Sequence, residues 1–396
     1  SYVTQKLDRD REVRPKLGLL YVAAQLRLQT GLTPRIMDCL AEGYSLVELE
    51  SRLRENPPDI VGLSVLTLGL LDCLAVARLV RRVCPQARIC FGGFHPTLYP
   101  HETLAFPEVD FIVIGEGEFT FAELVTALSG SPKPESLSGI RGLGWKDTRG
   151  GLHINEPRQP PASRDLDYLP IPAHDLLDFR KYSMVLCEGS GVAAVQTSRG
   201  CPYRCLFCDM RQTHYRYRSA DHVLRELKGL RELGVREFFV IDDTFTVDRG
   251  RVLEFCGKLR ALKLGLRYKI SARVDRVDAG MLAALADSGC HSVHYGVESG
   301  SQRILDFLQK GISLDQARQV FRMTKEAGMR TFAYMMIGIP TETAAEMNAS
   351  IRLVRELSPD HVNYSICLPL PRTPLYAYAL ETGRFSRDYW QEFASR

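Results

Sequence analysis

The first part of the chain alternates short apolar runs with amphipathic helical patterns. Nearly continuous apolar runs at residues 59–66, 88–91 and 110–114 predict parallel strands that are buried on both faces. A shorter strand is predicted at residues 34–38, and residues with helical spacing separate the runs. Strands that alternate with helices in this way predict an α/β fold with a doubly wound, Rossmann-like parallel sheet.

The second part repeats the alternation six times. A strand pattern is followed by a helical pattern at residues 192–195, 237–241, 268–273, 292–297 and 331–337, and a sixth strand is predicted at residues 361–366. Six β/α units are too few to close an eight-fold barrel. We therefore predict an open, partial (β/α)6 barrel with its active site at the carboxyl ends of the strands.

The patterns divide the chain into four segments. The Rossmann-like domain is predicted over residues 1–138, and a hairpin with a proline-rich linker over 139–180. The barrel is predicted over 181–375, and a C-terminal extension over 376–396. A chain of 396 residues is too long for one ordinary core, which supports this division. Because residue 1 is Ser rather than Met, we expect a processed or truncated start.

Composition narrows the class of protein. The net charge is +4 with both signs interspersed, so nothing in it indicates a nucleic-acid partner. No apolar segment approaches the length of a membrane span, and no signal peptide is visible. Eleven cysteines in 396 residues are not a disulfide framework, and they favour the reducing cytoplasm.

The most specific motif is the loop from Thr197 to Asp209. It places Cys201, Cys205 and Cys208 at the spacing C-x-x-x-C-x-x-C, directly after a predicted strand. Iron–sulfur clusters are held by cysteine thiolates, four for a complete cubane, so three thiolates leave one iron open to another ligand. The alternative is a structural zinc site, which needs four ligands and usually two C-x-x-C pairs. The chain has no second pair.

This loop resembles the defining loop of the radical S-adenosylmethionine (SAM) enzymes. The resemblance implies that Cys201, Cys205 and Cys208 hold a [4Fe-4S] cluster whose open iron binds SAM. Further residues at predicted strand ends match the family's motifs or suit the groups of SAM. They are Asp242 and Asp243 for the ammonium, Arg273 for the carboxylate, Glu298 for the ribose, and Phe207, Gly338 and Pro340 for the adenine. Ser271 and Ser299 lie at the same strand ends and are also predicted to bind the cofactor. A structural salt bridge is the alternative role for Arg273.

Three strands of the first domain also end in small or polar residues: Ser64 and Thr67, Gly92 and Gly93, and Gly115, Glu116 and Gly117. Such ends form the ligand crevice of open α/β sheets, although tight turns alone would also explain the glycines. The order of these pieces resembles the cobalamin-binding domain of one class of radical SAM enzymes. The Asp-x-His-x-x-Gly signature of cobalt-ligating histidines is absent, so His95 is not assigned as a ligand.

In that class, a SAM-derived radical abstracts hydrogen from the substrate, which then takes a methyl group from methylcobalamin. The resemblance therefore implies a methyltransferase acting on an unactivated carbon of a small-molecule or natural-product intermediate. It further implies SAM, a [4Fe-4S] cluster and cobalamin as cofactors, and an electron donor such as flavodoxin or ferredoxin. A rearrangement, cyclisation or oxidation without methyl transfer is the first alternative, and a non-enzymatic iron–sulfur or corrinoid-binding protein is the second.

Overall fold

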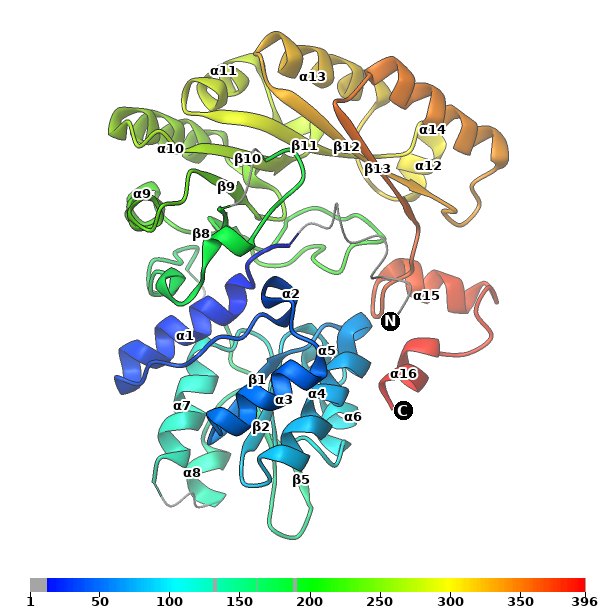
Figure 1. Ribbon diagram of the computed structural model, residues 1–396. Coiled ribbons are helices and arrows are strands. Elements are labelled where there is room, and N and C mark those ends of the chain that lie inside the picture. The colour runs from blue at the N-terminus through cyan, green and yellow to red at the C-terminus, as the bar shows by residue number, and fades with distance from the viewer. Residues whose placement is uncertain (1–12, 131–133, 162, 188–190, 396) are drawn as a thin grey trace. The chain divides into compact units, whose positions relative to one another are not determined.

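The computed structural model describes residues 13–130, 134–161, 163–187 and 191–395, which form two compact units (Figure 1). The sheet unit comprises residues 16–162, 169–177 and 385–395 as far as they are described. The barrel unit comprises the described residues before Lys16, residues 163–168 and the described part of 178–384. Neither unit is one continuous segment of the chain.

The sheet unit contains a five-stranded sheet in the order β1-β2-β3-β4-β5. The first three strands are parallel, and the last two are antiparallel and form a hairpin. The strands are β1 (Ile60–Ser64), β2 (Arg88–Gly92), β3 (Phe111–Val113), β4 (Leu143–Lys146) and β5 (Leu152–Ile154).

Helices cover both faces of this sheet, as the doubly wound prediction requires. Ile89 and Phe91 point to one face and share a core with residues of α3, α4 and α6, whereas Cys90 points to the other face, with α7 and α8. The helices are α1 (Leu17–Thr30), α2 (Cys39–Glu42), α3 (Leu46–Glu55), α4 (Leu70–Val83), α5 (Phe94–Leu98), α6 (Pro100–Ala105), α7 (Glu118–Leu128), α8 (Pro134–Ser138) and α16 (Tyr389–Ala394), with the short turns η2 (Thr67–Gly69) and η3 (His174–Leu176).

Two details of the predicted sheet were wrong. Residues 34–38 form no strand, and Met37 packs against the core beside α3 and α4 instead. Among the described residues no strand pairs on the outer side of β1, so β1 is an edge strand with Ser64 exposed, not a strand buried on both faces. The predicted hairpin is present, and it extends this sheet by pairing β4 with β3.

The barrel unit is built on six parallel strands in the order β13-β12-β11-β10-β9-β6, which confirms the open partial barrel. The strands are β6 (Val192–Val195), β9 (Glu237–Val240), β10 (Arg267–Ala272), β11 (Cys290–Glu298), β12 (Arg330–Ile337) and β13 (His361–Ile366). A separate two-stranded ribbon pairs β7 (Ser198–Arg199) with β8 (Arg216–Tyr217).

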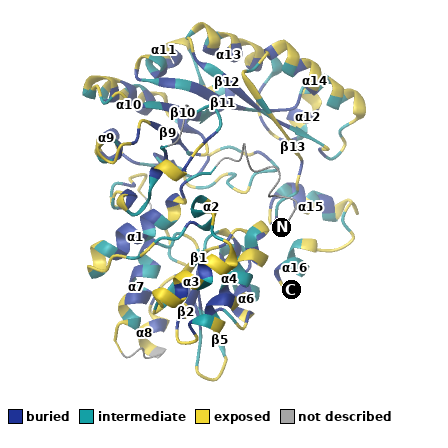
Figure 2. Cartoon of the chain, in the orientation of Figure 1, coloured by how far each residue is buried: buried dark blue, intermediate teal, exposed yellow. Residues whose placement is uncertain are grey.

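Strand residues alternate between the helix layer and the barrel interior. Phe238 stacks on Tyr268 at 5.1 Å and faces α10, whereas Phe239 packs against β6 in the interior. Figure 2 shows that β9 to β11 are largely buried and that the edge strand β13 is exposed. The outer elements are α9 (Ala220–Glu232), α10 (Arg249–Leu262), α11 (Ala279–Asp287), α12 (Gln302–Phe307), α13 (Leu314–Glu326), α14 (Ala344–Leu357), α15 (Pro374–Glu381), η4 (Phe179–Lys181), η5 (Phe245–Val247) and η6 (Val274–Arg276).

Candidate active site

The three cysteines lie on a compact loop that follows β6 and the ribbon strand β7. Cys201 and Cys205 are buried and Cys208 is half-buried. The Cys201 N–H donates to Thr213 Oγ1 at 2.8 Å, and the Cys208 N–H donates to the Cys205 carbonyl at 3.3 Å. Gly200 has a φ of 85°, and a Cβ there would lie 2.3 Å from the His214 carbonyl oxygen, so the loop requires glycine at its entrance.

The spread of the three sulfur atoms argues against a zinc site. Among the residues described, only Cys187, Glu237 and His291 offer three ligand atoms that all lie within 4.8 Å of one another. At least one pair of the loop sulfurs therefore lies farther apart. Two sulfurs on one zinc ion, each at about 2.3 Å, are separated by at most about 4.6 Å. The loop thus fits a multi-iron cluster better than a single ion.

The group formed by Cys187, Glu237 and His291 lies near the amino ends of the barrel strands, away from the cysteine loop, and it is unsuited to a metal. Glu237 begins β9 and His291 is the second residue of β11. His291 Nδ1 accepts a hydrogen bond from Arg330 Nη2 at 2.9 Å, so Nε2 carries the ring hydrogen and faces the Glu237 carboxylate. A metal-binding histidine donates the hydrogen of its other ring nitrogen to an acceptor. In His291 that nitrogen instead accepts a hydrogen bond from a cationic guanidinium.

Burial shapes the chemistry of the cysteine loop. It raises the pKa of the Cys201 thiol, and it raises the pKa of Cys208 to about 12. Thiolates must form when such cysteines bind iron, so metal binding and deprotonation are coupled at this loop.

Asp242 supports the loop from behind rather than facing a ligand. Its carboxylate, which is buried, accepts the N–H groups of Thr197 and Ser198 at 2.6 and 3.0 Å, and their hydroxyls at 2.5 and 2.6 Å. Arg251 completes the cluster, with Nη1 donating to Thr197 Oγ1 at 2.8 Å. The predicted contact of Asp242 with the SAM ammonium would have to compete with these four hydrogen bonds.

Asp243, by contrast, is exposed beside the cysteine loop. Desolvation by the surrounding loop, together with the Asp242 and Asp209 carboxylates, raises its pKa to about 6. Its charge acts in turn on Cys201. Of the two predicted acids, Asp243 is therefore the one placed to meet a cationic ligand.

Arg273 follows β10 and is buried beside the same loop. Its Nε and Nη2 donate to the two carboxylate oxygens of Asp275 at 2.9 and 3.2 Å, and Nη1 lies 3.8 Å from Cys205 Sγ. The guanidinium carbon lies 4.0 Å from the centre of the Tyr203 ring. The salt bridge that was the alternative for Arg273 is therefore present.

Glu298, at the end of β11, forms a buried ion pair that the sequence did not reveal. Its Oε1 accepts a hydrogen bond from Lys310 Nζ at 2.7 Å, and both side chains are buried. Lys310 also lies 5.7 Å from the centre of the Phe207 ring, and Phe207 contacts the apolar cluster that contains Ile339. The one sequence signal for Lys310 is that it precedes a glycine, in the turn that follows α12.

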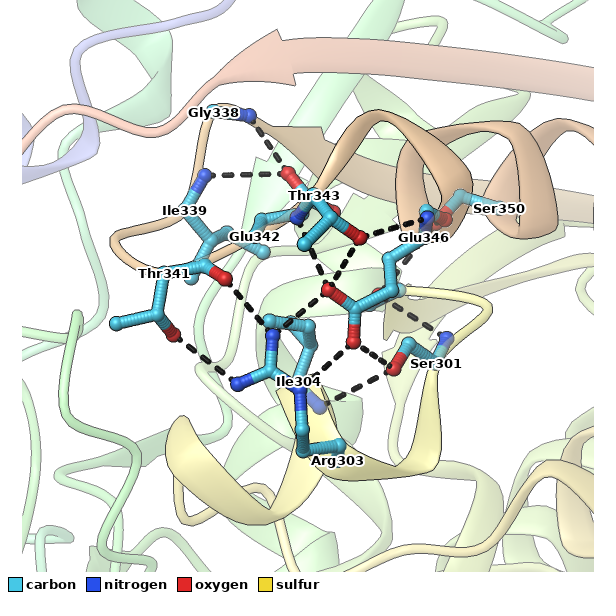
Figure 3. A network of polar contacts seen from close by, with 11 residues as sticks. Ser301, Arg303, Ile304, Gly338, Ile339, Thr341, Glu342, Thr343, Glu346 and Ser350 are labelled. Carbon is cyan, nitrogen blue, oxygen red and sulfur yellow. Dashed lines mark hydrogen bonds and ion pairs between the residues drawn. The ribbon is translucent and has the colours of Figure 1, made fainter.

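The loop after β12, which contains Gly338 and Pro340, is fixed by its own carboxylate (Figure 3). Glu342 Oε2 accepts the N–H groups of Gly338 and Ile339 at 2.8 and 3.2 Å. Nearby, Arg303 donates to the Thr341 carbonyl at 2.8 Å and to Glu346 at 2.7 Å. The adenine-binding loop predicted here is thus held by hydrogen bonds from its own residues and from Arg303.

The two predicted serines have different surroundings. Ser271 is half-buried on β10 and pairs in register with His294, on the interior face of the barrel. Ser299 is fully buried, and its Oγ lies 3.4 Å from Ser350 Oγ on α14. Ser299 therefore joins a strand to a helix, and Ser271 is the better placed of the two for a ligand.

In the sheet unit, the three predicted strand ends come together. Thr97 Oγ1 accepts the Gly115 N–H at 2.9 Å and donates to the Gly93 carbonyl at 2.8 Å. A Cβ on Gly93, which has a φ of 100°, would lie 3.1 Å from the Val65 carbonyl oxygen. The loops that contain Ser64, Thr67, Gly92, Gly93, Gly115, Glu116 and Gly117 therefore form one edge.

Apolar side chains border the same edge. Leu66, Leu68, Leu71 and Phe94 are 47% to 69% exposed, and they follow β1 and β2 directly. Exposed apolar groups around glycine-rich backbone fit a large ring system such as a corrin. His95 is fully buried behind this edge, and its Nδ1 lies 3.3 Å from Thr67 Oγ1, so it is not exposed to a ligand there.

Comparison with known proteins gives two family matches in the order of the two units. Residues 11–125 match the model of a B12 binding domain, and residues 195–354 match the model of the radical SAM superfamily. An uncharacterised methyltransferase of Pyrococcus horikoshii is 34% identical over 386 residues, covering 96% of this chain and 82% of that protein. An anaerobic magnesium-protoporphyrin IX monomethyl ester cyclase of Rubrivivax gelatinosus is 27% identical, covering 91% of this chain and 66% of that protein.

A solved structure shares the fold. The radical SAM methyltransferase TsrM of Kitasatospora setae, with cobalamin and a [4Fe-4S] cluster bound, has a TM-score of 0.77 at 20% identity. The match covers 94% of this chain and 76% of that one. In the part of the chain that the structure describes, no helix is long and apolar enough to cross a membrane.

Proposed function

Because the chain belongs to the radical SAM enzymes that carry a B12-binding domain, we propose that it is a cobalamin-dependent methyltransferase acting on a carbon of a small molecule. One observation carries the proposal. A three-cysteine loop at the mouth of a partial barrel and a glycine-rich, apolar-bordered strand edge in a second unit occur in the same chain. When bound, the cluster supplies the electron that cleaves SAM, and cobalamin carries the methyl group.

The cysteine loop would hold the cluster through Cys201, Cys205 and Cys208. Its backbone is fixed by the Gly200 turn and by the buried carboxylate of Asp242. A loop that is already ordered presents its thiolates without a further ordering cost, which favours cluster uptake.

The polar groups of SAM would bind at the carboxyl ends of β9 and β11. Lys310 has three N–H donors and uses one on Glu298, so it can pair with the SAM carboxylate as well. Glu298 can accept from the ribose hydroxyls, and Asp243 can accept from the ammonium. Lys310 takes the role that was predicted for Arg273, whose guanidinium is committed to Asp275.

The adenine would lie against apolar surface beside these groups. Phe207 contacts the cluster formed by Ile304, Leu308 and Ile339, directly next to Lys310. Gly338 and Pro340 flank Ile339 on the loop held by Glu342. Ser271 extends the site along β10 toward the barrel interior.

The cobalamin would bind the edge formed by Ser64, Thr67, Gly92, Gly93, Gly115, Glu116 and Gly117. Glycines allow the corrin to approach the backbone closely, and Leu66, Leu68 and Phe94 supply apolar contacts. His95 is not assigned as a cobalt ligand, because its side chain is fully buried. A low-potential one-electron donor, such as flavodoxin or ferredoxin, would reduce the cluster.

The alternative is a cyclisation or another radical reaction without methyl transfer, as the name of the Rubrivivax relative illustrates. The test uses the anaerobic full chain reconstituted with iron, sulfide and hydroxocobalamin, then given dithionite and SAM with a 13C-labelled methyl group. We expect 5′-deoxyadenosine, S-adenosylhomocysteine and labelled methylcobalamin. 5′-Deoxyadenosine without S-adenosylhomocysteine would favour the alternative, and neither product would overturn the proposal.

Cysteine variants make the test specific. Cys208→Ala should abolish 5′-deoxyadenosine formation and lower bound iron. Cys39→Ala is the matched control, because Cys39 is also half-buried but lies on α2 in the other unit, and it should match the wild type.

A further inference from the structure

Arg273 makes more contacts than its place in the sequence suggested, and one of them is to a predicted cluster ligand. It is buried at the carboxyl end of β10, although a guanidinium is costly to remove from water. The contacts that compensate this cost determine the direction in which each N–H group points.

Three neighbours fix the orientation of the guanidinium. Asp275 accepts from Nε and Nη2 at 2.9 and 3.2 Å, in the bidentate geometry that suits arginine. The Lys310 carbonyl accepts from Nη2 at 2.6 Å, and the Tyr203 ring covers one face of the group at 4.0 Å. These contacts leave Nη1 with a single direction.

That direction leads to a sulfur atom. Arg273 Nη1 lies 3.8 Å from Cys205 Sγ, within the range of an N–H···S hydrogen bond. The other two cysteines have different neighbours: Cys208 Sγ lies 4.0 Å from Asp209 Oδ1, and the charge of Asp243 acts on Cys201. Cys205 is therefore the cysteine whose sulfur has the Arg273 guanidinium beside it.

We propose that Arg273 is a positioning residue that donates a hydrogen bond to the Cys205 thiolate of the bound cluster and thereby raises the reduction potential of that cluster. Hydrogen bonds to the sulfurs and the net local charge are two of the factors that set such potentials. Reduction adds one negative charge to the cluster, and a fixed cation at one thiolate stabilises the reduced form more than the oxidised form. The inference rests on the proposed function, since it requires a cluster on this loop.

Asp275 and Tyr203 give this arrangement its rigidity. A lysine at position 273 would keep the charge but lose the fork that Asp275 holds. Arg276 offers a natural comparison, because it lies 3.5 Å from the same Asp275 carboxylate and 5.4 Å from the same Tyr203 ring, yet is 49% exposed. It brings a similar charge to the neighbourhood without the geometry of Arg273.

The experiment is a redox titration of the anaerobically reconstituted full chain, followed by the electron paramagnetic resonance signal of the reduced cluster. Wild type, Arg273→Gln, Arg273→Lys and Arg276→Gln are compared, with iron and sulfide per chain measured in each. We expect the midpoint potential of Arg273→Gln to be more negative than wild type. Arg273→Lys should lie between the two, and Arg276→Gln should match wild type.

The following results would contradict the role proposed for Arg273. Equal potentials in wild type and Arg273→Gln would overturn it, as would a shift in Arg276→Gln as large as that in Arg273→Gln. If Arg273→Gln takes up no cluster, Arg273→Lys decides, and a wild-type potential there overturns the hydrogen-bond role. A wild-type chain that takes up no cluster would instead overturn the proposed function, and the inference with it.

Discussion

Lys310 Nζ lies 2.7 Å from Glu298 Oε1, in space that the missing side chain of Gly296 leaves open. A Cβ on Gly296 would lie 2.5 Å from Glu298 Oε1 and 2.8 Å from Lys310 Nζ. Glu298 itself has a φ of 73°, after an irregularity in the pairing of β11 with β12. The end of β11 is therefore shaped around this ion pair, and the pair lies where the SAM carboxylate and ribose are expected.

Replacing Lys310 should be costly. Lys310→Met leaves the Glu298 carboxylate buried without its cation, which we expect to destabilise the chain by about 3–5 kcal/mol. Chemical denaturation without SAM measures this cost, and equilibrium binding measures the expected loss of SAM affinity. Arg318→Met is the control, since Arg318 pairs with Glu356 at 2.7 Å on the surface, where such pairs contribute about 0–1 kcal/mol. Equal costs in the two variants would contradict the prediction.

Gly296→Ala tests the space around the pair. The added methyl group would displace Glu298 and Lys310, at an expected cost of about 1–3 kcal/mol, and should weaken SAM binding. Gly257→Ala is the matched control, because a Cβ on Gly257 meets nothing within 4 Å inside α10. We expect that control to stabilise the chain by up to about 1 kcal/mol. A Gly296→Ala chain as stable as wild type would show that the pair can move aside.

Asp242 and Asp243 should differ in phenotype although they are adjacent. Asp242→Asn turns an acceptor of four hydrogen bonds into an amide, so we expect a loosened cysteine loop and less iron per chain after reconstitution. Asp243→Asn leaves those bonds intact, so it should keep the iron and lose SAM affinity. Full iron content in Asp242→Asn would remove its assigned supporting role.

His95 should make the sheet unit sensitive to acid. Burial lowers its pKa to about 4, against an ordinary value of about 6.5. Because the unfolded chain binds a proton there first, stability is complete above about pH 6.5 and declines as the pH falls toward 4, by up to about 3 kcal/mol. Denaturation midpoints between pH 7 and pH 4 measure the decline. The loss of stability between pH 7 and pH 4 should be smaller in His95→Gln. It should be unchanged in His101→Gln, because His101 is exposed on α6. An unchanged decline in His95→Gln would assign the acid sensitivity to other groups.

The sequence predicted features whose determinants are local or periodic. The three-cysteine motif spans residues 201–208, and the six strand–helix repeats follow directly from apolar spacing. The same periodicity led to a wrong prediction at residues 34–38, where Ile36 and Met37 suggested a strand that the structure does not contain. The apolar side chain of Met37 packs against the core of the sheet unit without forming a strand.

Partnerships between distant residues could not be predicted. Two adjacent acids look equivalent in a sequence, and only the end of β9 determines that Asp242 turns inward to Thr197 and Ser198. A period of two residues also does not reveal the irregularity between Gly296 and Glu298. Because that irregularity was not visible in the sequence, the pairing of Glu298 with Lys310, 12 positions further along, could not be predicted.

The discontinuous path of the chain has a consequence for biosynthesis. The core of the sheet unit is contacted by Phe393 of α16, and Gln391 on the same helix donates to Glu102 on α6. A ribosome that has completed β1 to β5 has therefore not yet supplied all the side chains of that core. These last contacts of the B12-binding unit can form only after the whole radical SAM barrel has been translated.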